Sequence, residues 1–383
     1  MNPELITVDE FVTLSARLAY QVESNFLNRR VLVNLMLKGA EIPEEVNPVL
    51  YESIGYLIYG YEGMRRRLGS LMLLHPLRTV TLLARAMPRP PRLDLLSALF
   101  HDRDEDIVNE KVNGDKLPHL NQKFAALENM ISTDDRWYLG ERISLLTKRD
   151  DMAYTAYIGR ILKKAEDKMP DLVRVKTADR LDNSLDLSLQ YPPQVAYEFY
   201  RIIFDILYLY PTGNVPIRLG VEHYRPSKPE AVLALSQLFK NVIYLSLVRM
   251  NRWDGRDEVV GKLFKALCLA SMRASQWIAT ELFIETDRKT LRELVIEARD
   301  YCAGGGTRKV TAAREGARLD GTLLKSYNLP NRDKRNAELS AIYDSPEKTI
   351  LVCLVLVSVF QSFLEDTSFY LEGITCDGIN PVD

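Results

Sequence analysis

The stretch "LFHDRDEDI", residues 99–107, places a histidine and five charged side chains directly after an apolar run. The run has the spacing of a helix with one apolar face, on which Leu95 and Leu99 lie. If this helix continues to Asp106, then Asp102 and Asp106 extend the same face, because both follow Leu95 at helical spacing. The stretch therefore predicts carboxylates on a buried helix face.

The other ionisable residues of this stretch fall on other sides of the predicted helix. His101 and Glu105 lie on the flank of the apolar face, while Arg103 and Asp104 point towards water. A buried carboxylate costs several kcal/mol unless a partner neutralises it. An arginine can neutralise one carboxylate, whereas a divalent metal ion can satisfy several, and histidine beside carboxylate suits transition metals. The pattern indicates a buried ion pair or a metal site.

A second helical pattern, residues 170–191, begins at a proline and also interrupts its apolar face with polar groups. Two apolar and three polar residues recur on this face: Leu172, Val175, Asp179, Asn183 and Asp186. The carboxylates of two separate helices therefore need partners in the interior.

Histidine is scarce in this chain, which has only four. His75 precedes His101 by one predicted helix, so two antiparallel helices would bring their imidazoles together. His119, in the expected loop "KLPHL", and His223, in "EHYRP", are predicted to lie at the surface without a metal role.

Helical periodicity dominates the chain and convincing strand alternation is absent, so we expect an all-α protein. Thr7 and Glu10 form a capping-box pattern, and Ser345 and Pro346 are a typical N-cap and first helical residue. Helices are expected over residues 7–23, 47–67, 75–87, 93–106, 170–191, 193–209, 228–250, 256–284, 287–300, 335–343 and 346–365.

Composition excludes some broad classes of function. The 50 basic and 52 acidic residues nearly cancel, so there is no basic excess of the kind that general nucleic-acid and membrane-surface binders show. The four scattered cysteines suggest reduced thiols in the cytoplasm. The N-terminus lacks a signal-peptide pattern. The apolar run 350–360 is shorter than the roughly 20 residues of a membrane span, so it is predicted to be a buried core helix.

Together, His75, the pair His101-Asp102 and the distant Asp179 resemble the H…HD…D signature of the HD-domain metal-dependent phosphohydrolases. The hydrolase domain of the RelA/SpoT family, which acts on the alarmone (p)ppGpp, is the more similar branch. "YEGMRRRLGSLMLLHPL" resembles its HxGQxRKSGxPxxxHPL segment, "LFHDRDEDI" its LLHDxxEDT and "VKTADRLDN" its KLADRLHN. The resemblance covers about residues 55–190.

The resemblance implies roles for ten residues. Four would be metal ligands, and the metal of the family is typically Mn²⁺: His75, His101, Asp102 and Asp179. Glu105 and Asp106 match the pair that helps activate the attacking water. The nucleotide and its phosphates would be bound by Arg66, Arg67, Lys176 and Asn183. These roles suit the chemistry, because a metal ion and carboxylates activate water while arginines neutralise phosphate charge.

The chain departs from the family pattern at several positions that shape the nucleotide pocket: Tyr61, Met64, Leu68, Ile107, Asp182 and Asp186. They put guanine specificity in doubt more than metal binding. Two alternatives to (p)ppGpp hydrolysis follow. One is an HD phosphohydrolase with another nucleotide or phosphoester as substrate, and the other is a degenerate HD module that binds nucleotide without turnover.

The resemblance also implies a domain organisation. We expect N-terminal helices in residues 1–50, an HD-domain helical bundle in 51–195 and a helical extension of unknown role in 196–383. The strands and motifs of the family's synthetase domain are absent after residue 195. The expected function is therefore metal-dependent hydrolysis of the 3′-pyrophosphate of (p)ppGpp or a related nucleotide, in a cytoplasmic protein without nucleic-acid or membrane partners. The oligomeric state stays open.

Overall fold

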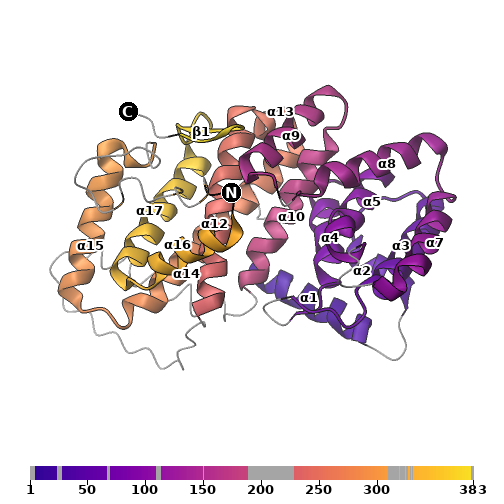
Figure 1. Cartoon of the computed structure of the whole chain (residues 1–383), viewed down its shortest axis with the longest axis horizontal. Helices are drawn as coiled ribbons and strands as arrows, with labels where there is room; N and C mark the ends of the chain where they lie inside the picture. Colours follow the sequence, from indigo (N-terminus) through magenta and orange to yellow (C-terminus); the bar gives the residue numbers. More distant parts are fainter. Residues whose placement is uncertain are drawn as a thin grey trace. The chain divides into compact units, whose positions relative to one another are not determined.

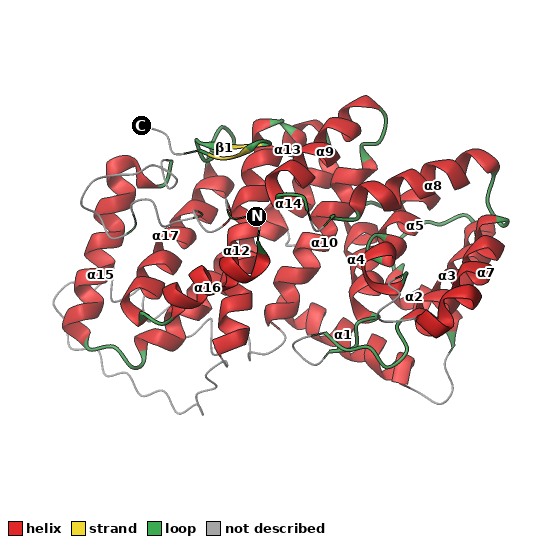
Figure 2. Ribbon diagram, viewed as in Figure 1, coloured by secondary structure: helices red, strands yellow, loops and turns green. Residues whose placement is uncertain are grey.

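The structure is a computed structural model of the chain. It describes residues 5–23, 28–66, 70–108, 114–149, 151–188, 228–308 and 331–380, and four single positions between residues 308 and 331. Nearly all regular structure in these residues is helical, which confirms the all-α prediction (Figure 2). The described strands are β1 (Ile374–Thr375) and β2 (Gly378–Ile379), a short antiparallel pair.

The helices of the first half of the chain carry or flank most of the predicted site residues (Figure 1). In chain order they are α1 (Val8–Glu23), α2 (Arg29–Met36), α3 (Asn47–Gly60), α4 (Leu74–Ala86), α5 (Arg92–Phe100), the π-helical turn η2 (Arg103–Ile107), α7 (Leu117–Glu128), α8 (Thr133–Leu146), α9 (Tyr154–Asp167) and α10 (Asp171–Ser188). Single 3₁₀ turns precede α3 and α7, at Glu44–Val46 and Gly114–Lys116.

The second half is also helical in its described residues. Its helices are α12 (Lys228–Met250), α13 (Trp253–Arg256), α14 (Glu258–Phe283), α15 (Arg288–Tyr301), the π-helical turn η4 (Cys302–Gly306), α16 (Arg332–Tyr343) and α17 (Pro346–Glu365). α12 packs against α16 and α17, and α15 packs against α17.

The chain forms two compact units. The first comprises residues 1–152, 157–183 and 251–266, and the second comprises residues 153–156, 184–250 and 267–383. Within the first unit, α4 packs against α1, α2 and α5, and α5 packs against α8. The predicted domain boundaries after residues 50 and 195 remain a prediction.

Local sequence signals place several helix starts correctly. Thr7 and Glu10 form the predicted capping box, because the Thr7 backbone N–H donates to Glu10 Oε2 at 2.9 Å and the Glu10 N–H donates to Thr7 Oγ1 at 3.2 Å. Ser345 caps α17 by accepting from the Lys348 N–H. The predicted helix 193–209 lies outside the described residues, and the helices α2, α7, α8 and α9 were not predicted.

The predicted helix 47–67 is wrong beyond Gly60. α3 ends there, and Gly63 adopts a φ of 76°, a left-handed conformation that breaks a helix. Arg65 then pairs with Leu71 in an isolated antiparallel bridge. Arg65 and Arg66, which the sequence placed in a last helical turn, therefore lie in a non-helical connection.

The predicted helix 93–106 is also wrong beyond Phe100. α5 ends at Phe100, Asp102 has φ −101° and ψ 8°, and the chain then makes the turn η2. As a result His101 is fully buried, whereas it was expected only on the flank of the apolar face. Arg103 does not point towards water either, because its Nε donates to Tyr56 Oη at 3.1 Å and its guanidinium lies 3.8 Å from the Phe124 ring centroid.

Two helices, α12 and α17, have the length and hydropathy that a membrane-crossing helix needs. Core helices share these properties, and 72% of the most apolar window of α12 and 56% of that of α17 are buried inside the protein. The run 350–360 lies in α17 and most of its side chains are buried, as predicted.

The close approach of α3 to η2 gives a first prediction. A methyl group at residue 60 would lie 2.8 Å from Ile107 Cγ2, and Ile107 is fully buried. Gly60→Ala should therefore lower the free energy of unfolding by about 1–3 kcal/mol, measured by urea denaturation. Gly140→Ala is the control, because nothing lies within 4 Å of the added methyl group. It should be neutral or stabilise α8 by up to about 1 kcal/mol. Equal stability of the two variants would contradict the packing described.

Candidate metal centre

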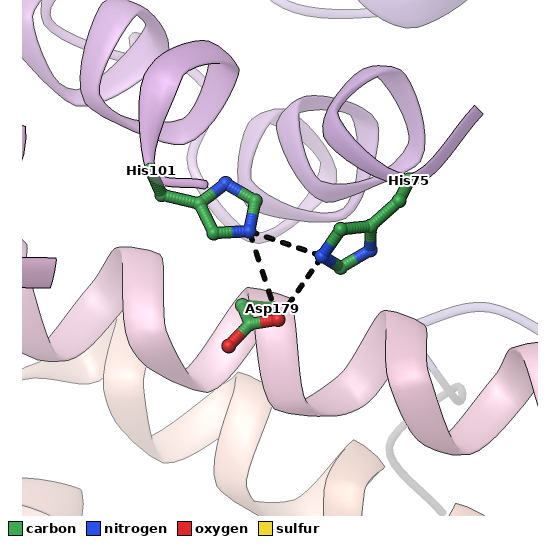
Figure 3. A group of neighbouring side chains, drawn as sticks. All are labelled: His75, His101 and Asp179. Carbon is green, nitrogen blue, oxygen red and sulfur yellow. Dashed lines mark hydrogen bonds and ion pairs between the residues drawn. The ribbon is translucent and has the colours of Figure 1, made fainter. Parts of the chain in front are cut away.

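Three helices of the first unit bring the predicted metal ligands to one point (Figure 3). His75 lies in the first turn of α4, where Pro76 is tolerated because a first-turn N–H has no intrahelical partner. His101 follows directly after α5, and Asp179 lies in the middle of α10. In Figure 3 both imidazole rings point towards the Asp179 carboxylate.

The ligand atoms lie close to one another in the interior. His75 Nε2 is 3.0 Å from His101 Nε2, and Asp179 Oδ1 is 3.2 Å from the first and 3.7 Å from the second. Asp102 Oδ2 is 3.2 Å from His75 Nε2 and 3.3 Å from His101 Nε2. His75, His101 and Asp179 are buried, while 23% of the Asp102 side chain is exposed. The four residues that the sequence singled out are thus brought together.

These spacings suit a coordinated cation. Ligand atoms at right angles about 2.1 Å from a metal ion are about 3.0 Å apart, and tetrahedral ligands are about 3.4 Å apart. The observed separations run from 3.0 to 3.7 Å. Among the described residues, His75, His101 and Asp179 form a buried group that could hold a metal ion.

The outer nitrogens of both rings favour the tautomer that a metal ligand needs. His75 Nδ1 lies 2.6 Å from Asp182 Oδ2, and His101 Nδ1 lies 2.8 Å from the carbonyl oxygen of Ala98. When each Nδ1 carries a proton, it donates to its oxygen, and both Nε2 lone pairs face the cluster. Two lone pairs and two carboxylates then converge, an arrangement that requires positive charge between them.

Protons supply that charge in the metal-free protein. Burial and the nearby Arg66 lower the pKa of His75, but hydrogen bonds to Asp102, Asp179 and Asp182 raise it to about 9. Burial opposes protonation of His101 too, yet the carboxylates of Asp102 and Asp179 hold its pKa well above the usual value. The same electrostatic demand that binds protons here would bind a divalent cation.

Asp182 and Arg78 form an ion pair next to the cluster, and the sequence did not predict it. Asp182 is fully buried, and its carboxylate accepts from Arg78 Nε at 2.7 Å and from Arg78 Nη2 at 3.1 Å. From the sequence, Asp182 was identified only as a departure from the family motif. The signal that could have found the pair is its spacing, since Arg78 follows His75 and Asp182 follows Asp179 by three residues each.

The two carboxylates predicted to be catalytic lie in η2, which follows Asp102 directly. Burial and the charge of Asp102 raise the pKa of Asp106 to about 7, and Asp106 Oδ2 accepts a hydrogen bond from Tyr61 Oη at 3.3 Å. Burial and the Asp102 carboxylate also raise the pKa of Glu105, whose Oε1 accepts from the backbone N–H of Lys148. Asp106 is therefore suited to exchange a proton near neutral pH.

Two of the predicted substrate-binding residues contact each other beside the cluster. Arg66 Nη2 donates to Asn183 Oδ1 at 2.5 Å, and Arg66 Nη1 lies 3.6 Å from Asp182 Oδ2. Asn183 Nδ2 in turn donates to Asp179 Oδ1 at 2.6 Å. Arg67 lies outside the described residues.

Lys176, which was predicted to bind substrate, lies beside Asp179. It is buried, and its Nζ lies 2.6 Å from Asp179 Oδ2 and 5.1 Å from the Tyr157 ring centroid. The lysine therefore holds one oxygen of Asp179 while the other oxygen faces the imidazoles. Its charge, together with hydrogen bonds from the imidazoles, offsets burial and keeps the pKa of Asp179 well below the usual value.

The other two histidines lie apart from the cluster or outside the described residues. His119 is exposed, as predicted, but it lies in α7 and not in a loop, and its ring packs edge-on against Tyr59. His223 lies outside the described residues.

The raised pKa of His75 predicts the pH dependence of stability of the metal-free protein. The folded-state pKa of about 9 exceeds the usual 6.5, so the stabilising protonation is complete below pH 6.5 and is lost as pH rises to about 9. This difference corresponds to about 3 kcal/mol. The raised pKa of Asp106 acts in the same direction. Urea unfolding with EDTA should therefore give a lower free energy of unfolding at pH 9 than at pH 6.5.

His75→Gln should reduce this pH dependence because glutamine does not titrate, whereas His101 and Asp106 still contribute. His119→Gln makes the same change at an exposed position and should retain the wild-type slope. Manganese should restore stability more strongly at pH 8.5 than at pH 6, because the metal ion competes with protons for the imidazoles. Stability that rises between pH 6.5 and 9 in EDTA would contradict the electrostatics described.

No family model matches the chain, and comparisons with curated proteins and with solved structures also find no match. The resemblance to the RelA/SpoT hydrolase domain therefore rests on the quoted motifs.

Proposed function

We propose that this chain is a divalent-metal-dependent phosphohydrolase that removes a pyrophosphate or phosphate group from a nucleotide. The observation that carries the proposal is the convergence of two imidazole nitrogens with a carboxylate oxygen of Asp102 and one of Asp179. The two nitrogens lie 3.0 Å apart, and each lies 3.2–3.7 Å from both carboxylate oxygens. Such a set of side chains would repel itself in the absence of a cation or protons, so it favours metal binding over a purely structural role.

The residues around the centre suit hydrolysis. A bound divalent ion would supply Lewis acidity, which makes a water molecule more acidic and neutralises charge on phosphate oxygens. Asp106, with a pKa of about 7, would accept a proton from the attacking water. Tyr61 orients Asp106 through its hydroxyl, and Glu105 is held by the Lys148 backbone.

Arg66 would bind substrate phosphate. Its side chain is 21% exposed and is oriented by Asp182 and Asn183. A guanidinium has five N–H donors, which allows one arginine to bind these partners and a phosphate group together. The buried Lys176 would act on Asp179, by holding Oδ2 so that only Oδ1 faces the metal centre.

The motif resemblance makes (p)ppGpp the first candidate substrate, with Mn²⁺ as the metal ion and the cytoplasm as the location. Free cysteines agree with a reducing compartment. A less charged nucleotide or phosphoester is the second candidate, because two departures from the family pattern lie at the site itself. Asp182 places a buried carboxylate 3.6 Å from Arg66, where it offsets charge that a polyphosphate would use, and Tyr61 contacts Asp106.

The direct experiment measures product release by the full chain. Metal-depleted protein is supplied with Mn²⁺ and incubated with ppGpp, pppGpp and nucleoside mono-, di- and triphosphates, and pyrophosphate and phosphate are quantified separately. Pyrophosphate from ppGpp supports the first candidate, and cleavage of another nucleotide supports the second. If Mn²⁺ binds but no compound is cleaved, the proposed hydrolase is wrong and a module that binds without turnover remains.

Substitutions separate metal binding from chemistry. Asp179→Ala should abolish both bound manganese, measured by elemental analysis, and turnover, because it removes a ligand and leaves Lys176 without its carboxylate. Asp106→Asn should retain manganese but lower kcat by about 100-fold or more, because it removes the proton acceptor.

Asp104→Asn is the matched control for both variants. Asp104 lies in the same turn as Asp106 and contacts Arg103, and 37% of its side chain is exposed. This variant should retain wild-type metal content and turnover. If Asp104→Asn and Asp106→Asn lower kcat equally, the specific role of Asp106 is wrong.

A further inference from the structure

A fully buried arginine lies one helical turn after His75. Arg78 has no exposed surface, and burial of such a charge requires a partner. Its Nε and Nη2 donate to the two oxygens of Asp182 at 2.7 and 3.1 Å. Two residues of α1 contact its other side, since its Nη1 lies 3.5 Å from Ser15 Oγ and its guanidinium lies 5.0 Å from the Phe11 ring centroid. The guanidinium is thus held from two helices.

The same carboxylate contacts a metal-centre residue. Asp182 Oδ2, which accepts from Arg78 Nη2, also lies 2.6 Å from His75 Nδ1. Asp182 follows Asp179 by three residues on α10, so one face of this helix presents a ligand and the partner of another ligand. His75 is therefore linked to Arg78 through a fully buried carboxylate, whose contact with the partly exposed Arg66 is longer, at 3.6 Å.

We infer that Arg78 and Asp182 are a positioning pair that sets the metal affinity of His75; the inference rests on the metal centre proposed above. A carboxylate that accepts the Nδ1–H fixes the tautomer and the ring orientation, and it makes the other nitrogen a stronger donor to metal. Arg78 keeps this carboxylate ionised and in place.

The hydrogen-bond acceptor at Nδ1 differs between the two histidines. His101 Nδ1 donates to a neutral acceptor, the Ala98 carbonyl oxygen, whereas His75 has an ionised partner. The RLHN motif of the resembling family would place a neutral or cationic histidine at position 182, which cannot supply an anionic acceptor. The ion pair between Arg78 and Asp182 is therefore not implied by the family motif, and it explains why a buried aspartate stands at position 182.

The test measures Mn²⁺ affinity, independent of any substrate. Loss of one member alone would leave an uncompensated buried charge, so the principal variant replaces both, Arg78→Met with Asp182→Leu. Apolar replacement of a whole buried ion pair is often neutral for stability. The dissociation constant is measured on metal-depleted full chain from the EPR signal of free Mn²⁺. It should rise by about 10–100-fold, the usual effect of losing an outer partner of a metal-binding histidine.

A second buried pair provides the control. Arg142 Nε and Nη2 bind the two oxygens of Asp171 in the same two-point manner, and both residues are buried. Arg142→Met with Asp171→Leu therefore removes a matched ion pair without touching a predicted ligand. Its dissociation constant for Mn²⁺ should stay within about twofold of wild type. Circular dichroism and urea midpoints report whether each variant is folded.

The outcomes distinguish the inference from the proposal beneath it. If wild type binds no Mn²⁺, the metal centre itself is wrong. If wild type binds and the folded variant with Arg78→Met and Asp182→Leu binds equally well, or no worse than the control pair, the positioning role is overturned and the metal centre stands. Should that double variant fail to fold, Asp182→Asn decides, because it retains the shape and removes the charge. Its dissociation constant should rise by about tenfold, and an unchanged value overturns the inference.

Discussion

The interaction on which the proposed chemistry depends is the convergence of two neutral nitrogen donors and two carboxylates in a largely buried space. Burial of each carboxylate costs free energy because it removes the charge from water. Two carboxylates close together also repel each other. Neighbouring groups offset part of this cost by binding the outer atoms of these side chains. Asp182 and Ala98 take the outer nitrogens of the two rings, and Lys176 takes the outer oxygen of Asp179. His75 Nε2, His101 Nε2 and Asp179 Oδ1 then lie within 3.0–3.7 Å of one another, so positive charge between them stabilises the arrangement.

The geometry of the chain around His101 and Asp102 explains how two successive residues reach one point. Neighbouring residues on a regular helix differ by about 100° in direction and do not face the same partner. Because α5 ends at Phe100, the backbone of Asp102 leaves the helical conformation and its carboxylate comes within 3.3 Å of His101 Nε2. The same change of direction carries Glu105 and Asp106 into a π-helical turn, where Gly60 allows Ile107 to pack closely.

Much of the fold, and the identity of four side chains that converge in the first unit, could be predicted from the sequence, because helical spacing, capping residues and short motifs are local signals. Helical spacing predicted the helices α10 and α17, and capping residues predicted where α1 and α17 begin. The motifs singled out His75, His101, Asp102 and Asp179 as candidate site residues. The same spacing extended two helices too far. The left-handed Gly63 and the turn after Phe100 depend on tertiary packing that periodicity does not record.

Salt bridges between residues could not be predicted from the helical spacing or the motifs either. Arg78 and Asp182 are 104 positions apart, and neither residue type alone indicates a buried pair. Lys176 was assigned to substrate from its motif, whereas its salt bridge to Asp179 depends on how deeply α10 is buried.

Helix α10 carries Lys176, Asp179, Asp182 and Asn183 within about two turns of one rigid rod. A single inserted or deleted residue between Asp179 and Asp182 would rotate one aspartate by about 100° relative to the other. One change of chain length would therefore separate the proposed ligand Asp179 from Asp182, the proposed partner of His75, although every side chain would still be present. The proposed site thus depends on the length of this segment as much as on the identity of its residues.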